Sequence, residues 1–158
     1  MGQKYRIYLD VCCLNRPLDN SAQDRIRLEA EAVLLIYRKC RMGEWDLVIS
    51  DAIEAEVRRT PNPQKKEQVM LALLVASSAV ELSYAIQQRA RDLENLGFKS
   101  FDAAHIACAE AGQVDVMLTT DDRLLRTATR AQNALLIAIK NPVNWLLEIN
   151  QIEDGEDL

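Results

Sequence analysis

Short segments rich in β-branched and aromatic residues alternate with longer helical segments along the whole chain. The first of these β-rich segments, residues 5–9, ends at Asp10. Later segments of the same kind occupy residues 46–49, 79–82, 114–118 and 135–139. Strands that alternate with helices form βαβ units, in which the strands are parallel and the helices cover both faces of the sheet. The order of the segments therefore predicts an α/β fold with a parallel sheet, although residues 79–82 could also continue the preceding helix.

Residues that start or stop helices delimit the segments between these strands. Residues 22–42 carry apolar side chains at helical spacing and are followed by Gly43, whereas residues 11–21 have the composition of a loop. Two ion pairs between side chains four residues apart are expected on the first helix, Arg25 with Glu29 and Arg27 with Glu31. Further helices are expected after the Ser50-Asp51 cap, through residues 69–75, over residues 84–96, from Ser100 to Gly112, over residues 122–130 and from Pro142.

The length of 158 residues fits one domain with one hydrophobic core. We expect a folded domain over residues 1–149 and a disordered acidic tail over residues 150–158. No apolar run approaches the roughly 20 residues that span a bilayer, so no membrane segment is expected. Four cysteines without a metal-type spacing predict reduced, mostly packed thiols in a cytoplasmic protein.

The net charge of −5 argues at first against a nucleic-acid partner, because lysine and arginine normally drive phosphate binding. Four of the acids, however, lie in the last seven residues. A cluster of acids that binds metal ions also presents positive charge to a phosphate. The charge balance therefore excludes neither kind of partner.

Four acids fall where a parallel sheet would place a ligand. Asp10 and Asp121 directly follow strands, Glu56 lies on the helix after the second strand, and Asp102 begins the helix that leads to the fourth. Ligands of open α/β sheets bind outside the carboxyl ends of the strands. Carboxylates are the oxygen ligands that Mg²⁺ and Mn²⁺ prefer, and a bound metal ion activates water against a phosphodiester. Each acid also has a simpler explanation, as a turn residue, a surface charge, a first-turn acid or an N-cap.

Four segments, in this order and spacing, closely resemble PIN-domain proteins, including VapC-like toxins of toxin–antitoxin pairs. They are YLDVCCLNRP, ISDAIEAEV, SFDAAHIACAE and LTTDDRLL. The resemblance implies a Rossmann-like three-layer α/β/α sandwich with a central parallel sheet of four to five strands. It also implies an Mg²⁺- or Mn²⁺-dependent endoribonuclease that acts on RNA, with a cognate antitoxin protein and a homodimer as further expectations.

Carried over residue by residue, the family's catalytic and metal-binding acids correspond to Asp10, Glu56, Asp102 and Asp121, with Thr119 as the threonine of the T-x-D turn. Glu54 and Asp122 are close rivals of Glu56 and Asp121. Val11 and Cys12 stand where many members have a hydroxyl residue and a small polar residue. That departure motivates the alternative of a catalytically silent PIN fold that binds RNA or protein. A phosphatase or a response-regulator receiver fits less well, because the second acid of the phosphatase motif and a correctly placed lysine are missing.

Several other polar residues are candidates for contact with the substrate. Asn15 and Arg16 lie in the loop after Asp10, and Arg123 and Arg126 form with Arg130 a basic stripe beside Asp121. A solvated surface explains each of them equally well. His105, the single histidine, is expected to be structural or to support a ligand. Trp145 and Leu146 are expected in the core or in a dimer surface.

Overall fold

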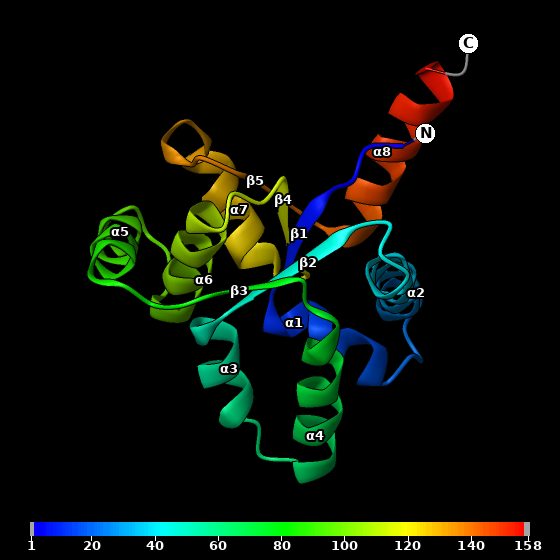
Figure 1. The fold of residues 1–158 in the computed structure, drawn as a ribbon, viewed down its shortest axis with the longest axis horizontal. Coiled ribbons are helices and arrows are strands. Elements are labelled where there is room, and N and C mark those ends of the chain that lie inside the picture. The colour runs from blue at the N-terminus through cyan, green and yellow to red at the C-terminus, as the bar shows by residue number, and fades with distance from the viewer. Residues whose placement is uncertain (1, 157–158) are drawn as a thin grey trace.

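The computed structural model describes residues 2–156, with side chains as far as residue 151, and contains one five-stranded parallel sheet (Figure 1). The strands are β1 (Arg6–Leu9), β2 (Asp46–Ser50), β3 (Ser78–Val80), β4 (Val116–Leu118) and β5 (Ala138–Lys140). Their order in the sheet is β3-β2-β1-β4-β5. Every neighbouring pair is parallel, with Ile7 opposite both Leu47 and Val116. The predicted α/β sandwich with a parallel sheet is confirmed.

Helices enclose the sheet on both faces. They are α1 (Val11–Asn15), α2 (Asp24–Arg41), α3 (Asp51–Arg58), α4 (Pro63–Ala72), α5 (Tyr84–Asn95), α6 (Ser100–Ala111), α7 (Asp122–Arg130) and α8 (Pro142–Glu156). Helices α2 and α8 pack together on one side of the sheet, and α5 and α6 pack together on the other (Figure 1). Because both faces are covered, the central strands are almost wholly apolar, and Ile7, Leu9 and Leu118 are fully buried.

The segment after Asp10 differs from the predicted loop. Residues 11–15 form α1, and Arg16–Leu18 form a 3₁₀ turn, η1. The helix begins because the Asp10 carboxylate accepts a hydrogen bond from the backbone N–H of Cys13. Burial of Val11, Cys13 and Leu14 under the sheet edge then stabilises this five-residue helix, although the composition of the segment is typical of a loop.

Smaller differences lie at the ends of elements. The predicted 79–82 strand is confirmed as a strand but begins at Ser78, and the last strand starts at Ala138 instead of residue 135. Residues 132–134 form a 3₁₀ turn, η3, before it, and the Leu136 N–H donates to Glu110 Oε2 there, so this stretch is held by α6 and not by β4.

Two local expectations about helices are wrong. Lys99, not Ser100, is the N-cap residue of α6, and no side chain caps that end. Arg27 pairs with Asp24 at 2.8 Å and not with Glu31. The expected pair between Arg25 and Glu29 is confirmed at 3.2 Å.

Helix α8 continues to Glu156, into the segment for which the sequence favours disorder from residue 150. Its packing begins with Trp145 and Ile149, which are both buried against the core. A helix nucleated by such packing extends without further tertiary contacts, because each added residue gains one backbone hydrogen bond. Residues 157 and 158 lie outside the described part of the chain.

An aromatic cluster closes the amino end of the sheet. Tyr5 and Trp45 immediately precede β1 and β2, and Trp145 of α8 packs against both. The ring centroids lie 5.1–5.6 Å apart in edge-to-face arrangements. Trp145 is therefore a core residue, and Leu146 is half-buried beside the core. None of the helices in the described residues is long and apolar enough to cross a membrane.

Candidate functional site

The strand order reverses between β1 and β4. From β1 the chain proceeds to β2 and β3 on one side, then returns through α5 and α6 to β4 and β5 on the other. Such a reversal opens a crevice at the carboxyl edge, which is where open α/β sheets bind ligands. Asp10 follows β1 directly, and its N–H donates to the carbonyl of Leu118 at the end of β4. The first candidate acid therefore lies at the point of reversal.

Asp10 is buried, with 3% of its surface exposed, and is held by neutral donors. Its Oδ1 accepts the N–H of Cys13 at 2.9 Å. Burial raises the pKa of Asp10, and a hydrogen bond from the Thr119 hydroxyl partly opposes that rise. Within the described residues, no lysine or arginine forms an ion pair with Asp10. The carboxylate is thus desolvated and fixed in orientation without a compensating cation.

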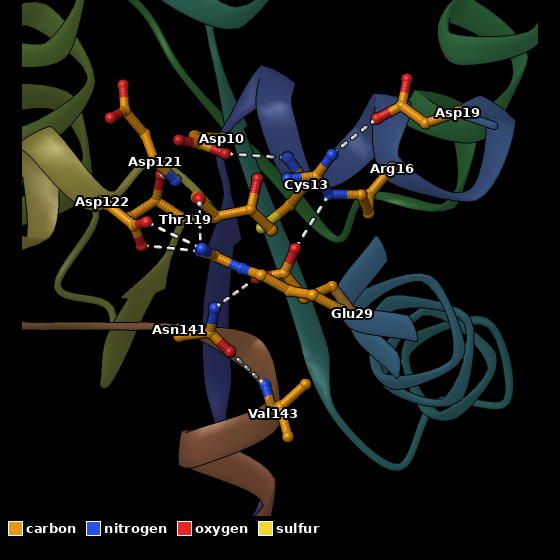
Figure 2. Close-up of polar contacts among 12 residues, drawn as sticks. Asp10, Cys13, Arg16, Asp19, Glu29, Thr119, Asp121, Asp122, Asn141 and Val143 are labelled. Atoms are coloured by element: carbon orange, nitrogen blue, oxygen red, sulfur yellow. Dashed lines mark hydrogen bonds and ion pairs between the residues drawn. The ribbon is translucent and has the colours of Figure 1, made fainter. Parts of the chain in front are cut away.

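The turn after β4 orients Asp121 into the same region. Its N–H donates to Thr119 Oγ1 at 3.1 Å, and its Oδ1 caps α7 by accepting the N–H groups of Arg123 and Leu124. The N-cap explanation is therefore correct, and it leaves Oδ2 available for another partner. Figure 2 shows Asp10 and Asp121 on the same side of Thr119.

Asp122 is committed elsewhere. Arg25 of α2 donates to both of its carboxylate oxygens, at 2.7 and 2.6 Å, and these hydrogen bonds lower the pKa of Asp122. Of the two adjacent acids, Asp121 forms no ion pair with an arginine in the described part of the chain, whereas Asp122 does.

Glu56 approaches the site from α3. Ser50 ends β2 and starts this helix by accepting the Ile53 N–H at 3.2 Å. The Glu56 side chain is 30% exposed, and its Oε1 lies 2.7 Å from Nε2 of the buried His105. The rival Glu54 instead lies 3.9 Å from Arg58, one turn along the same helix. The helix therefore directs Glu56, and not Glu54, toward α6 and the sheet edge.

Asp102 lies in the first turn of α6, half-buried beside the other acids. Burial, followed by the negative charges of Asp121 and Asp10, raises its pKa to about 6. A carboxylate is shifted in this direction when like charges approach it without a cation between them. The raised pKa of Asp102 therefore reflects repulsion from neighbouring carboxylates whose charge is not compensated.

The pKa of the Cys12 thiol responds to all four candidate acids. Its pKa is raised first by desolvation and then by the charges of the four acids Asp10, Asp121, Glu56 and Asp102. All four candidate acids therefore lie within electrostatic range of Cys12.

The donor set fits a hard divalent cation, although the acids do not form a closed cage. Among the described residues, no three histidine, cysteine or acidic side chains are arranged tightly enough to enclose a metal ion. Mg²⁺ is usually bound through one or two carboxylates and keeps several waters, so an open set of oxygen donors suits it. The raised pKa of Asp102 indicates repulsion that such a cation would remove.

A groove of about 480 Å³ adjoins Glu56 between α1 and α4. Asn15 lines it, together with two cations that sequence reasoning missed, Arg59 and Lys65. Arg59 lies over the ring of Phe101 at 5.0 Å, and Lys65 lies 3.8 Å from Asp19. The Thr60-Pro61 sequence between the two cations resembles any interhelical turn, so no local pattern indicated their role.

The other predicted contact residues are placed differently. Arg16 is engaged by Asp19 at 3.0 Å and by Glu29 at 3.1 Å. Arg123 and Arg126 are exposed on α7, next to Asp121. Thr119 is fully buried and orients the two aspartates. Of these residues only Arg123 and Arg126 present free cationic side chains near the acids.

A second network, which sequence reasoning missed, centres on Glu29 of α2, and Figure 2 shows it on the other side of Thr119 from Asp10. Glu29 is 2% exposed. Arg16 Nε lies 3.1 Å from its Oε1, as an ion pair without hydrogen-bond alignment. Arg25 Nε and Asn141 Nδ2 donate to its Oε2 at 3.2 and 2.7 Å. This buried acid therefore ties η1, α2 and the start of α8 together.

Comparison with known proteins agrees with this architecture. The chain is similar to FitAcB from Neisseria gonorrhoeae, with a TM-score of 0.54 and 16% identity over 86% of this chain and 97% of that one. It is also similar to VapBC2 from Rickettsia felis, solved with a DNA fragment from its promoter, with a TM-score of 0.52 and 13% identity over 86% and 98%. A search among curated proteins finds no match. The family model of the PIN domain matches residues 7–130, and the chain therefore belongs to the PIN domain family.

Proposed function

We propose that this chain is a divalent-metal-dependent endoribonuclease that hydrolyses phosphodiester bonds in RNA. The observation that carries the proposal is that Asp10, at the reversal of strand order, is buried without a lysine or arginine partner among the described residues, with three further acids within electrostatic range. Membership in the PIN domain family, whose members are generally nucleases, supports the same chemistry.

In this proposal Asp10 and Asp102 are the main ligands of Mg²⁺ or Mn²⁺. When bound, the ion supplies Lewis-acid charge for the scissile phosphate and for the attacking water. Asp10 binds in the orientation that the Cys13 N–H fixes. Glu56 serves as a ligand or orients the water, and Asp121 contributes the carboxylate oxygen that does not cap α7.

The groove beside Glu56 supports single-stranded RNA as the substrate. Arg59 and Lys65 line this groove, and Arg123 and Arg126 are exposed on α7, the helix that Asp121 caps. A backbone that crosses the acids from one pair to the other would exchange counterions for arginine and lysine at both ends. Asn15 lies on this path as a neutral donor. Arg16 already pairs with two acids, so its role in RNA binding depends on its position beside the groove and not on a free charge.

We further propose that the chain is the toxin of a type II toxin–antitoxin pair, that it forms a homodimer and that it acts in the cytoplasm, where it meets RNA. The fold shared with VapBC2 supports this biological role. An apolar groove of about 140 Å³ between η1, α2 and α4, lined by Leu18, Leu34 and Tyr37 among others, offers an antitoxin an apolar surface. Co-expression with the product of a short neighbouring gene, followed by co-purification, tests the partner.

The catalytic proposal is tested by cleavage of a labelled RNA with Mn²⁺. We expect Asp10→Asn to lose at least about 10²-fold in rate, because it removes an anionic ligand while keeping the size of the side chain. Glu54→Gln is the matched control, since it removes a charge from the same edge without touching the acids around Cys12. Undiminished cleavage by folded Asp10→Asn would contradict the proposal.

A catalytically silent PIN fold that binds RNA or protein is the second candidate. The open spacing of the acids favours it, as do Val11 and Cys12 in place of a hydroxyl residue and a small polar residue. Calorimetric titration with Mn²⁺ separates the two, because the nuclease proposal requires binding that Asp10→Asn abolishes. No detectable binding by the unaltered protein would favour the silent module.

A further inference from the structure

A chain of buried hydrogen bonds runs from Glu56 into the sheet. Nε2 of His105 lies 2.7 Å from Glu56 Oε1, and its Nδ1 lies 2.7 Å from the hydroxyl of Tyr8. The Tyr8 hydroxyl lies 2.6 Å from Ser50 Oγ. Tyr8, His105 and Ser50 are at most 2% exposed, so their contacts with one another are shielded from water, whereas the contact between His105 and Glu56 is partly buried. The chain joins α3, α6, β1 and the end of β2.

We propose that His105 is a positioning residue, which together with Tyr8 and Ser50 fixes the carboxylate of Glu56 for the metal-dependent reaction. The inference rests on the proposed nuclease function and adds to it a residue outside the four acids. Each member of the chain has a hydrogen-bond partner within it, and His105 holds Oε1 of the Glu56 carboxylate.

The protons of the chain can be assigned in one direction with a neutral His105. The Ile53 N–H donates to Ser50 Oγ, the Ser50 hydroxyl donates to Tyr8, and the Tyr8 hydroxyl donates to Nδ1 of His105. Nδ1 is then an acceptor, and the ring carries its proton on Nε2, where it donates to Glu56. With this direction of donation, Tyr8 selects the tautomer of His105 that can hold the carboxylate.

The same chain also fixes the helix that carries Glu56. The Ser50 oxygen that ends the chain caps α3, so the start of the helix and the end of its glutamate side chain are anchored to one set of bonds. A glutamate on a helix loses considerable rotamer entropy when it is ordered. Holding Oε1 in advance lowers that cost and leaves Oε2 available for another partner. Partners that orient ligands in this way typically contribute 10–100-fold to metal affinity or activity.

A histidine that merely fills the core would predict a different set of responses. Its replacement by leucine would leave the Mn²⁺ affinity unchanged, and its NMR signals would not respond to a substitution at Glu56. The two roles are separable because His105 is the only histidine in the chain, so its ring nitrogens give a single, assignable NMR signal set.

The first measurement compares His105→Leu, His105→Gln and Tyr8→Phe by Mn²⁺ calorimetry and RNA cleavage. We expect His105→Leu to weaken Mn²⁺ binding by about 10–100-fold and to lower kcat with little change in KM for RNA. His105→Gln, whose amide can donate to Glu56, should recover most of that loss, and Tyr8→Phe should fall between. Equal Mn²⁺ affinity and kcat in folded His105→Leu and the unaltered protein would overturn the inference.

The second measurement needs neither cleavage nor a folded His105 variant. In metal-free protein labelled with ¹⁵N-histidine, we expect the Nε2-protonated tautomer at fixed pH. Glu56→Gln should shift the Nε2 signal, and Glu54→Gln should leave it in place. In the unaltered protein, Mg²⁺ should shift Nε2, and Glu56→Gln should abolish that response. An Nε2 signal that ignores Glu56→Gln overturns the inference even if the protein proves to be a nuclease, whereas absent Mn²⁺ binding and cleavage would overturn the nuclease proposal alone.

Discussion

Asp10 and Glu29 are buried to the same degree on opposite sides of Thr119, yet their surroundings differ. Glu29 is 2% exposed and meets two arginines and an asparagine. Asp10 is 3% exposed and is held by the Cys13 N–H, the Cys13 thiol and the Thr119 hydroxyl, and burial raises its pKa. A buried charge normally has a partner that offsets its desolvation. The comparison indicates that Glu29 holds the fold together, whereas Asp10 keeps its capacity for a cation from solution.

The largest contrast is expected from two isosteric neutralisations. Glu29→Gln should lower the free energy of unfolding by about 3 kcal/mol, because it removes the buried anion that Arg16 and Arg25 share. Asp10→Asn in metal-free protein should leave stability unchanged or raise it, because it removes a charge that nothing compensates. Urea denaturation in EDTA measures both. A loss from Asp10→Asn as large as that from Glu29→Gln would contradict the distinction.

Addition of a divalent cation should sharpen the same comparison. At a Mn²⁺ concentration 100 times its Kd, the unaltered protein should gain about 2.7 kcal/mol of stability, since the ion binds only the folded state. Glu29→Gln should keep this gain although its baseline is lower, and Asp10→Asn should lose it. Thermal unfolding with and without Mn²⁺ provides the measurement, with Ca²⁺ as a test of ion preference. A gain that Asp10→Asn retains would place the ion elsewhere.

A smaller effect is expected from Asp102 as a function of pH. Its pKa is raised to about 6 in the folded protein, above the value of about 3.9 in an unfolded chain. The raised pKa of Asp102 therefore stabilises the folded state relative to the unfolded state below pH 4. This stabilisation is lost as the pH rises through 6. Asp102→Asn should be more stable than the unaltered protein by about 1–2 kcal/mol at pH 8, a figure discounted for the partial exposure of the side chain.

The control for this prediction is the same pair of proteins at pH 4, where both carry a neutral group at position 102 and their stabilities should converge. Mn²⁺ at pH 8 should reverse the order, because it stabilises only the protein with the intact carboxylate. A stability difference that is independent of pH would mean that repulsion among the acids is not its source.

The strand-end acids were predictable because their positions follow from chain direction alone. Asp10 and Asp121 come immediately after buried strands or their turns, and parallel strands bring their carboxyl ends to one edge. The choice of Asp121 over Asp122 rested on the turn motif. The structure adds the physical reason, because Arg25 occupies Asp122.

Contacts between helices were not predictable, because they depend on how separate elements pack. The sequence places Glu56 and His105 on two helices but contains no sign that α3 and α6 bring them within 2.7 Å. Likewise, Glu29 was expected only as a surface partner of Arg25, and its burial follows from the packing of α8 on α2. The sequence did not predict that Arg59 and Lys65 line a groove, for the same reason.

The aromatic cluster at the amino end of β1 makes this molecule convenient to observe. Both tryptophans of the chain, Trp45 and Trp145, belong to that cluster, and the only histidine lies toward the opposite, carboxyl edge of the sheet. Fluorescence therefore monitors global unfolding from one end of the sheet, while the imidazole signals follow events at the other. Two native spectroscopic probes, on separate wavelengths and nuclei, can thus report on collapse and on site chemistry in one sample without any attached label.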